Sequence, residues 1–468
     1  MHAEQAYLFR HALLRDAAYE LQLPGDRARL HELAFYLIEQ AFGGRAPEPP
    51  PLGLIDPPAM PGHQSDAVAS ELAEHARLAQ CQPELHRLYL RRAAEHAESR
   101  HRLADASTTW QTLAMLLDNP LQAAALYRAA IALFGSGRPA EAEALLDRAL
   151  EAFQGCGDRR AVGIALASMA NVYIESGRLE QALKALEQAI VISREKGSRS
   201  LEGMAFAGLA IVHDFAGRAD LAEKSYEQAL AIFRDVGNRR REGVVTGNLA
   251  RLHSVTGRLD VSERLSHEAL KIHREVGDQR SVGGQLGSLA MTYHQTGRME
   301  LAERTYEQAL AIQRQQGDRR AEGIVLGNLA GAYADTKRFE HAERTYRQAL
   351  SIHREVGNRR FEGSALSGLA YLQRQTGQLE QAEVTHALAL AIQREVGNRR
   401  SEGFILCDSA LCQLSLGRVS RARAEWREGA LVLREVGDKH ELERQTSAMR
   451  KECAEAGEPP FDEPLPAE

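Results

Sequence analysis

The chain has 468 residues, which at about 150 residues per domain corresponds to about three domains. Its 58 Lys and Arg and 64 Asp and Glu residues give a formal net charge of −6. This balance makes no general case for nucleic-acid binding, although it leaves room for a local basic patch. Hydrophobic residues make up 44% and aromatic residues only 6%, and the helix formers Ala, Leu, Glu and Arg dominate. The composition therefore favours an all-α protein.

The sequence shows no sign of export or membrane insertion. No apolar run approaches the roughly 18 residues of a membrane span, and the N-terminus lacks a basic segment followed by an apolar core. The cysteines are odd in number and scattered in spacing, namely Cys81, Cys156, Cys407, Cys412 and Cys453. We interpret them as reduced thiols, and we expect a cytoplasmic protein that makes no membrane contact.

The first expected element is a helical segment, residues 1–45, which carries a recognisable set of residues. The set comprises Phe9, His11, Leu13, Ala18, Tyr19, Arg27, Leu30 and His31, followed by Glu71-Leu72-Ala73-Glu74-His75. It resembles the stretch that follows the ATPase domain in bacterial signalling ATPases with numerous domains. The sequence contains no G-x-x-x-x-G-K-[ST] phosphate loop. The resemblance therefore implies the helical arm of such a protein without its ATPase domain. The chain would be either a fragment or a partner of an ATPase on another chain.

Two further segments precede the regular part of the chain. Residues 46–66 contain most of the prolines of the N-terminal half, so we expect a flexible connector rather than a long helix. Residues 67–119 are expected to form degenerate helical repeats.

A strict 40-residue period begins near residue 137 and continues to residue 437 without insertion. Glycines mark it at positions 157, 197, 237, 277, 317, 357, 397 and 437, and a second glycine series has Lys337 in one slot. The repeat 278–317 has apolar residues at helical spacing on both sides of Gly297. Each repeat is therefore predicted to be a helix A, a tight turn, a helix B and a second tight turn.

The repeat also predicts helix starts and helix packing. Small residues at 290, 302 and 309 allow the two helices to approach closely, and Leu289, Tyr293 and Tyr306 are expected to fill the space between them. Predicted N-caps of helix A are Asn238, Asp278, Asp318, Asn358 and Asn398. A helix pair cannot bury its apolar face alone, so the repeats should stack into a solenoid.

These positions resemble the tetratricopeptide repeat, in its 40-residue form rather than the usual form of about 34 residues. The residues that match are Leu289, Ala290, Tyr293, Gly297, Ala302, Tyr306 and Ala309. Similar repeats occur in animal cell-polarity and G-protein-modulator adaptors and in bacterial signalling proteins. The resemblance implies a right-handed superhelix with about eight repeats over residues 120–437, a capping helix at 438–456 and a disordered tail at 457–468.

By analogy with this family, certain helix A positions face a concave groove that binds a protein or peptide partner. These positions hold Asn171, Asn248, Arg251, Met291, His294, Asn328, Tyr371, Arg374 and Asp408. A neighbouring position is always small (Ala167, Ala207, Gly247, Gly287, Gly327, Ser367 and Cys407), which would leave room for a ligand main chain. Asn side chains supply both a donor and an acceptor, which suits an extended peptide.

Arginines recur at the start of helix A and predict a ladder along one edge of the solenoid. Its rungs include Arg160, Arg240, Arg280, Arg320, Arg360 and Arg400. Cations at a helix N-terminus oppose the helix dipole, so another interaction must compensate. One interpretation is pairing with Glu two residues on (Glu242, Glu322, Glu362 and Glu402) or with acids of the previous repeat. The other is an acidic peptide, phosphate or nucleic-acid ligand.

No residue set indicates catalysis or metal binding. His96 and His101, like Cys407 and Cys412, are five residues apart and point to different helix faces, and no nucleophile motif is present. We therefore expect no enzyme activity, no metal and no cofactor. The leading hypothesis is a sensor or regulatory arm of a bacterial signalling ATPase or kinase system. The alternatives are a free-standing scaffold and a ligand-binding Arg ladder, and the oligomeric state stays open.

Overall fold

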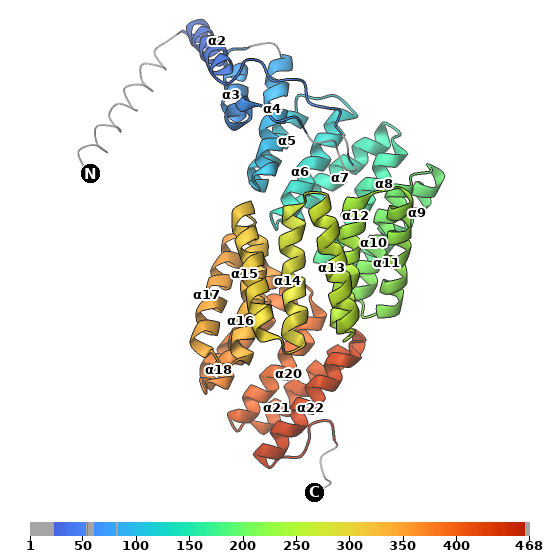
Figure 1. The fold of residues 1–468 in the computed structure, drawn as a ribbon, viewed down its shortest axis with the longest axis vertical. Helices are drawn as coiled ribbons and strands as arrows, with labels where there is room; N and C mark the ends of the chain where they lie inside the picture. The colour runs from blue at the N-terminus through green and yellow to red at the C-terminus, as the bar shows by residue number, and fades with distance from the viewer. Residues whose placement is uncertain (1–22, 53, 55–59, 81–82, 464–468) are drawn as a thin grey trace, which may run out of the picture. The chain divides into compact units, whose positions relative to one another are not determined.

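A computed structural model describes residues 23–52, 54, 60–80 and 83–463. Every regular element among these residues is a helix (Figure 1), and the all-α solenoid is confirmed. The chain divides into two compact units. The N-terminal unit comprises Met1–Gly135 and Ala144–Gly157, and the C-terminal unit comprises Ser136–Glu143 and Asp158–Glu468. Each unit is described by itself.

The described part of the N-terminal unit starts with helices of uneven length. They are α2 (Pro24–Ala41), the 3-10 helix η1 (Gln64–Val68), α3 (Ala69–Leu78), α4 (Pro83–Ser99) and α5 (Leu103–Ala114). Of the predicted segment 1–45, residues 1–22 lie outside the described residues, including Phe9, His11, Leu13, Ala18 and Tyr19.

The proline-rich segment is more ordered than its composition predicted. The fully buried guanidinium of Arg92 donates to Asp66 Oδ1 at 2.7 Å and to the carbonyl oxygens of Pro47 and Pro61, each at 2.9 Å. Ala46 is also buried. The described residues of 46–66 are therefore held against α4 instead of forming a flexible connector, because their free carbonyl groups satisfy a buried cation.

Sixteen helices then alternate as A and B helices. The A helices are α6 (Leu121–Gly135), α8 (Arg159–Glu175), α10 (Arg199–Phe215), α12 (Arg239–Val255), α14 (Gln279–Gln295), α16 (Arg319–Asp335), α18 (Arg359–Gln375) and α20 (Arg399–Ser415). The B helices are α7 (Pro139–Gly155), α9 (Leu179–Glu195), α11 (Ala219–Asp235), α13 (Leu259–Glu275), α15 (Met299–Gln316), α17 (Phe339–Glu355), α19 (Leu379–Glu395) and α21 (Val419–Glu435).

The turns and caps follow the sequence pattern closely. Gly297 has φ +74° and Gly317 has φ +69°, as a left-handed residue after a helix requires. Lys337 adopts the same conformation without being glycine, with φ +59°. Of the predicted N-caps, Asn238, Asp278, Asp318 and Asn398 accept a hydrogen bond from a first-turn backbone N–H. Asn358 makes no such bond, so its predicted side-chain cap is wrong.

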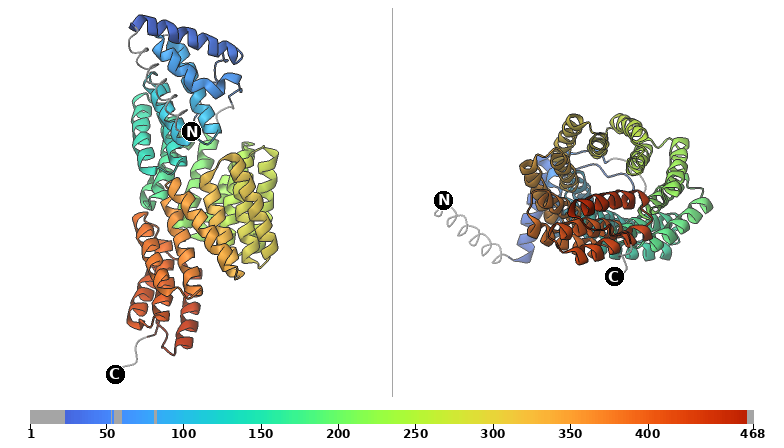
Figure 2. Two further views of the ribbon diagram at one scale, coloured as in Figure 1. Left: turned by 90° about the vertical axis from the view of Figure 1, so that its left-hand side faces the viewer. Right: turned by 90° about the horizontal axis from the view of Figure 1, so that it is seen from below.

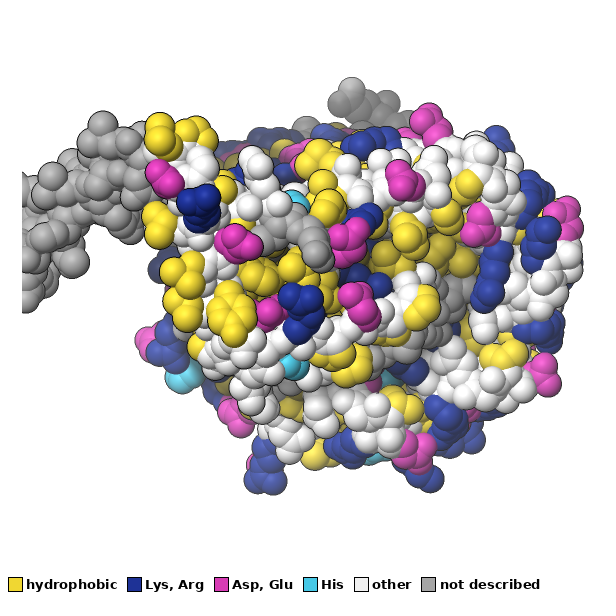
Figure 3. All heavy atoms as spheres, turned by 90° about the horizontal axis from the view of Figure 1, so that it is seen from above, with side chains coloured by type: hydrophobic (Ala, Val, Ile, Leu, Met, Phe, Trp, Pro, Cys, Tyr) yellow, Lys and Arg dark blue, Asp and Glu magenta, His cyan; other side chains and the backbone are white. Residues whose placement is uncertain are grey.

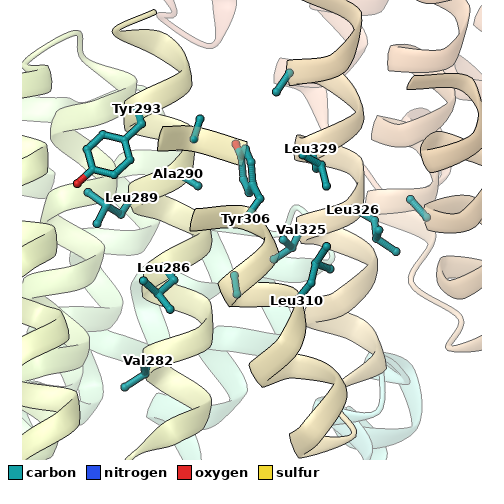
Figure 4. Packing of buried hydrophobic residues seen from close by; sticks show 14 of the residues in the cluster. Val282, Leu286, Leu289, Ala290, Tyr293, Tyr306, Leu310, Val325, Leu326 and Leu329 are labelled. Atoms are coloured by element: carbon teal, nitrogen blue, oxygen red, sulfur yellow. The ribbon is translucent and has the colours of Figure 1, made fainter. Parts of the chain in front are cut away.

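Apolar side chains fill the space between α14, α15 and α16 (Figure 4). Leu289, Tyr293 and Tyr306 are buried there as predicted, and they pack against Leu310 and Leu326. Ala302 and Ala309 are completely buried, so α14 and α15 come close together. Removing one such large side chain would cost about 2–5 kcal/mol, because the rigid helices could not collapse on the cavity.

Successive A helices of the C-terminal unit also contact one another, for example α12 with α14 and α14 with α16. The A helices therefore lie on the inner side of a superhelix (Figure 2). Within the C-terminal unit, residues that are one superhelical turn apart lie in contact. A Cβ atom on Gly177 would lie 3.0 Å from the carbonyl oxygen of Gly397, which is 220 residues and five and a half repeats further on. Only glycine, with φ +72° at 177, fits this contact.

The C-terminal end is capped by α22 (Lys439–Ala456) and by the residues that follow it. Phe461 is fully buried against Trp426 and Met449. Arg423 donates to the carbonyl oxygens of Pro459 and Pro460, each at 3.1 Å. The disorder expected for 457–468 is therefore wrong for residues 457–463, because one aromatic residue seals the apolar end of the solenoid. Residues 464–468 lie outside the described residues.

Candidate functional site

The inner surface has a cavity of about 350 Å³ that is lined by residues of α14 to α18. Three residues of the predicted groove line it: Met291, His294 and Asn328. Apolar and aromatic side chains complete the lining, among them Ile324, Tyr346 and Phe361. An apolar cavity with a few polar groups at its rim is typical of a site that takes up a ligand side chain.

The three predicted asparagines are all half-buried on A helices. Within the part of the chain that the structure describes, no side-chain hydrogen bond is made by Asn171, Asn248 or Asn328. Their amides therefore keep a donor and an acceptor for another molecule.

The row of small residues leaves less room than the sequence indicated. A Cβ atom on Gly287 would lie 3.2 Å from Cγ2 of Val325, and the space beside Gly247 is taken by the side chain of Gln285. Cys407 is fully buried. A Cβ atom on Gly327, by contrast, would meet no atom within 4 Å. Of these glycine positions only Gly327, which lines the cavity, is open, because the others face the next A helix.

The charged residues of the predicted groove are engaged within the chain. Arg251 forms an ion pair with Asp214, and His294 Nε2 lies 2.8 Å from Asp335 Oδ2. Arg374 donates to Glu452 on α22 at 3.1 Å and lies 3.9 Å from Asp408. Asp408 is buried and Tyr371 is half-buried. These side chains shape the inner surface, and a ligand would have to compete with their partners.

His386 was not singled out by the sequence, yet it lies fully buried beside Asp408. Its Nε2 is 3.5 Å from Asp408 Oδ2. Burial lowers the pKa of His386, while Asp408 opposes that effect. Its position in helix B holds Tyr306 and Tyr346 in other repeats, so the period predicts a buried aromatic residue there and gives no signal for a histidine.

Where a repeat has arginine at the first position of helix A, that arginine pairs with acids of its own repeat. Arg239 lies 2.6 Å from Glu242 and 2.7 Å from Glu275, and Arg359 lies 2.6 Å from Glu362 and 2.7 Å from Glu395. Although burial acts in the opposite direction, hydrogen bonds from Arg234 and Arg239 keep the pKa of Glu242 below its usual value.

The second arginine reaches forward to the next repeat rather than back to the previous one. Arg240 lies 3.0 Å from Asp278, Arg280 lies 2.7 Å from Asp318 and Arg400 lies 2.5 Å from Asp438. Each acceptor is the N-cap of the helix that begins the next segment (α14, α16 or α22), which explains how a cation is tolerated at a helix start. Arg160 is exposed, whereas Arg320 and Arg360 lie on the inner side of this edge and are half-buried.

The residues that carry the N-terminal resemblance meet in part. His31 on α2 and His75 on α3 lie with their Nδ1 atoms 2.8 Å apart. Burial and then the proximity of His75 lower the pKa of His31. The other face of α2 is apolar and open, since Leu30, Leu33, Tyr36 and Leu37 are 51–57% exposed. Figure 3 shows hydrophobic side chains gathered at this end of the N-terminal unit.

No metal site is found in the part of the chain that the structure describes, and three of its four described cysteines are buried. It holds no group of three or more His, Cys, Asp or Glu residues able to bind a metal ion. Burial raises the pKa of Cys407 to about 12 and that of Cys412 to about 11, so both stay protonated thiols. Cys81 lies outside the described residues. No described helix has both the length and the apolar character needed to cross a bilayer.

Comparisons with known proteins agree with this architecture. A family model of the tetratricopeptide repeat matches residues 121–195, 161–235 and 285–355, and a second model of the same repeat matches residues 245–276. The chain therefore carries tetratricopeptide repeats, and these make it a protein–protein interaction module. No curated protein matches the sequence.

Several solved structures are similar in fold. A Rap protein, crystallised in complex with Competence and Sporulation Factor, has 12% identity and a TM-score of 0.56, covering 80% of this chain and 99% of that one. A signal transduction ATPase with numerous domains and a tetratricopeptide repeat sensor, from Pyrococcus horikoshii, has 19% identity and a TM-score of 0.45. That match covers 70% of this chain, which spans about half (52%) of the ATPase chain.

Proposed function

We propose that the chain binds an extended segment of a partner protein along the inner face of its C-terminal unit, centred on the cavity beside Gly327. The cavity is the observation that carries this proposal. It joins an apolar pocket to the amide of Asn328, which has no intramolecular hydrogen bond to a described residue, and it lies where a ligand main chain could approach α16 closely. An extended peptide needs this combination of apolar and amide contacts.

We further propose that binding regulates a bacterial signalling ATPase or kinase in the cytoplasm. Support comes from the resemblance of the N-terminal segment and from the open apolar face of α2, which offers a surface for a further domain. A free-standing scaffold that joins two partners is the alternative. A ligand that binds the Arg ladder is the second alternative, and its affinity would fall steeply with salt.

Gly327→Leu is the sharpest test of the groove. Leucine at 327 would place its side chain in the cavity, and its Cβ would meet no atom within 4 Å. Replacing a helical glycine should also favour the helix by up to about 1 kcal/mol. Gly284→Leu is the matched control, because Gly284 is equally unhindered in helix α14 but does not line the cavity.

The full chain and both variants would be immobilised and incubated with lysate of the source organism, and bound proteins would be quantified by mass spectrometry. A partner retained by the wild type and Gly284→Leu but reduced at least about tenfold on Gly327→Leu supports the groove. An ATPase or kinase among the lost partners supports the regulatory arm, whereas other partners favour the scaffold. Partners that bind Gly327→Leu as well as the wild type would refute the groove.

A further inference from the structure

The Arg ladder is uniform in sequence but not in its charge partners. Arg240, Arg280 and Arg400 each pair with an aspartate 38 residues further on, at the N-cap of α14, α16 or α22. The same position holds Asn358 for Arg320 and Asn398 for Arg360. An amide at this position removes the negative charge, although Asn398 still accepts the N-cap hydrogen bond from the backbone N–H of Ser401. Arg320 and Arg360, which are neighbours in the ladder, therefore lack the aspartate partner of the other three arginines.

These two rungs behave differently in the structure. Arg320 turns to Glu175 on α8, at 3.5 Å. Arg360 lies over the ring of Phe215, with its guanidinium carbon 4.4 Å from the ring centre. No carboxylate of a described residue lies within ion-pair distance of Arg360, although Glu175 and Asp214 act on it from further away. Burial lowers the pKa of Arg360, and the nearby cations Arg251 and Arg320 lower it further.

Arg360 faces a cavity of about 330 Å³ where one turn of the superhelix meets the next. Arg251 and Asp214 also line this cavity, together with apolar side chains from both turns, namely Ile174, Leu179, Val396 and Val436. Five arginines (218, 251, 360, 399 and 400) and three acids (Glu175, Asp214 and Glu435) line the cavity. Arg251 pairs with Asp214, Arg399 with Glu435 and Arg400 with Asp438, while Glu175 pairs with Arg320. Among the described residues, neither Arg218 nor Arg360 has a carboxylate within ion-pair distance, so the cavity keeps surplus positive charge.

We propose that this cavity binds one carboxylate group of a peptide, with Arg360 as its partner. Arginine presents two parallel N–H donors that match the two oxygens of a carboxylate. The aromatic ring of Phe215 holds the guanidinium plane in place, which favours this geometry. Free phosphate has no apolar group to place against the lining, so a peptide carboxylate fits the cavity better. The apolar lining would accept the side chain next to the carboxylate, which can be a peptide C-terminus or an Asp or Glu side chain.

Small probes test the site without the natural partner. Binding of N-acetylphenylalanine, N-acetylphenylalaninamide, the α-amide of N-acetylglutamate and inorganic phosphate to the full chain would be titrated by ligand-observed NMR. The first and third probes carry a terminal and a side-chain carboxylate, respectively, and the second carries none. We expect at least one carboxylate probe to bind about tenfold more tightly than the uncharged amide and than phosphate.

Two variants and two matched controls locate the site. Arg360→Gln removes the cation, and Asn398→Asp restores the missing aspartate so that Arg360 is neutralised while it stays in place. Both should weaken carboxylate binding about tenfold. Arg280→Gln removes an arginine of the ladder that lies outside the cavity. Asn238→Asp makes the same N-cap change at a position whose ladder partner, 38 residues earlier, is Ser200 instead of an arginine. Both controls should bind as the wild type does, and circular dichroism would show that all four remain folded.

Equal binding of the amide and carboxylate probes would overturn the proposal, as would wild-type binding by Arg360→Gln or by Asn398→Asp. Tighter binding of phosphate would overturn the assignment to a carboxylate. We place this site within the peptide-binding function proposed above. The variants here leave the cavity beside Gly327 intact, so loss of partner capture by Gly327→Leu and loss of probe binding by Arg360→Gln can occur independently.

Discussion

Acidification should destabilise the C-terminal unit through His353, a residue of helix α17. The side chain is 1% exposed and packs against α16, where a Cβ atom on Gly323 would lie 2.7 Å from its Cε1. Burial lowers the pKa of His353 from the ordinary value of 6.5 to about 4, with Glu362 opposing the change and Arg320 adding to it. The folded protein therefore holds this imidazole neutral at pH values where the unfolded chain is protonated.

The sign and size of the effect follow from proton linkage. Below pH 6.5 the unfolded chain binds a proton that the folded chain does not. The contribution of His353 to the free energy of unfolding is therefore fully present above pH 6.5 and decreases as the pH falls toward 4. The difference between 6.5 and about 4, at about 1.4 kcal/mol for each pH unit, corresponds to about 3 kcal/mol lost by pH 4.

His353→Gln should remove most of this loss. The repeats themselves place Gln313 and Gln393 at the equivalent position, so glutamine fits the site. Hydrogen exchange of α17 peptides, measured by mass spectrometry at pH 7, 6, 5 and 4, would compare variant and wild type at each pH, which cancels the intrinsic exchange rate. We expect similar protection at pH 7 and about 3 kcal/mol more in the variant at pH 4.

His341→Gln provides the control on the same helix, since His341 is exposed. It should follow the wild type at every pH. Equal loss of protection in the wild type and His353→Gln between pH 6.5 and pH 4 would refute the reasoning, because it would show that His353 does not carry the linked proton.

Two further substitutions test repeat register against tertiary packing. Gly429 stands where Ala389 stands in the preceding repeat, yet a Cβ atom at 429 would lie 2.8 Å from the carbonyl oxygen of Gly403. Gly429→Ala should therefore destabilise the protein by about 1–3 kcal/mol, and an unchanged melting temperature would contradict this close contact. Lys337→Gly should stabilise it by about 1 kcal/mol, because Lys337 has φ +59°. A lower urea midpoint in Lys337→Gly would show that the lysine makes a compensating contact.

The sequence by itself determined the repeat. Glycine at the left-handed turns, acidic or amide residues at the N-caps and the alternation of small and large apolar residues are local signals, and each repeats every 40 residues. They predicted the helix pairs and the buried contacts of Leu289, Tyr293 and Tyr306, because in a solenoid each repeat packs on its immediate neighbours.

Tertiary structure decided which predicted positions remain available to a ligand. The small residues at 247 and 287 looked equivalent to Gly327, but the next A helix covers them. The contact between Gly177 and Gly397 depends on small rotations that accumulate over five and a half repeats, and no local signal encodes their sum. That closure brings Phe215, Arg251 and Arg360 to one cavity. The structure of one repeat is therefore set by local signals that the sequence shows, whereas the candidate sites arise from superhelical geometry.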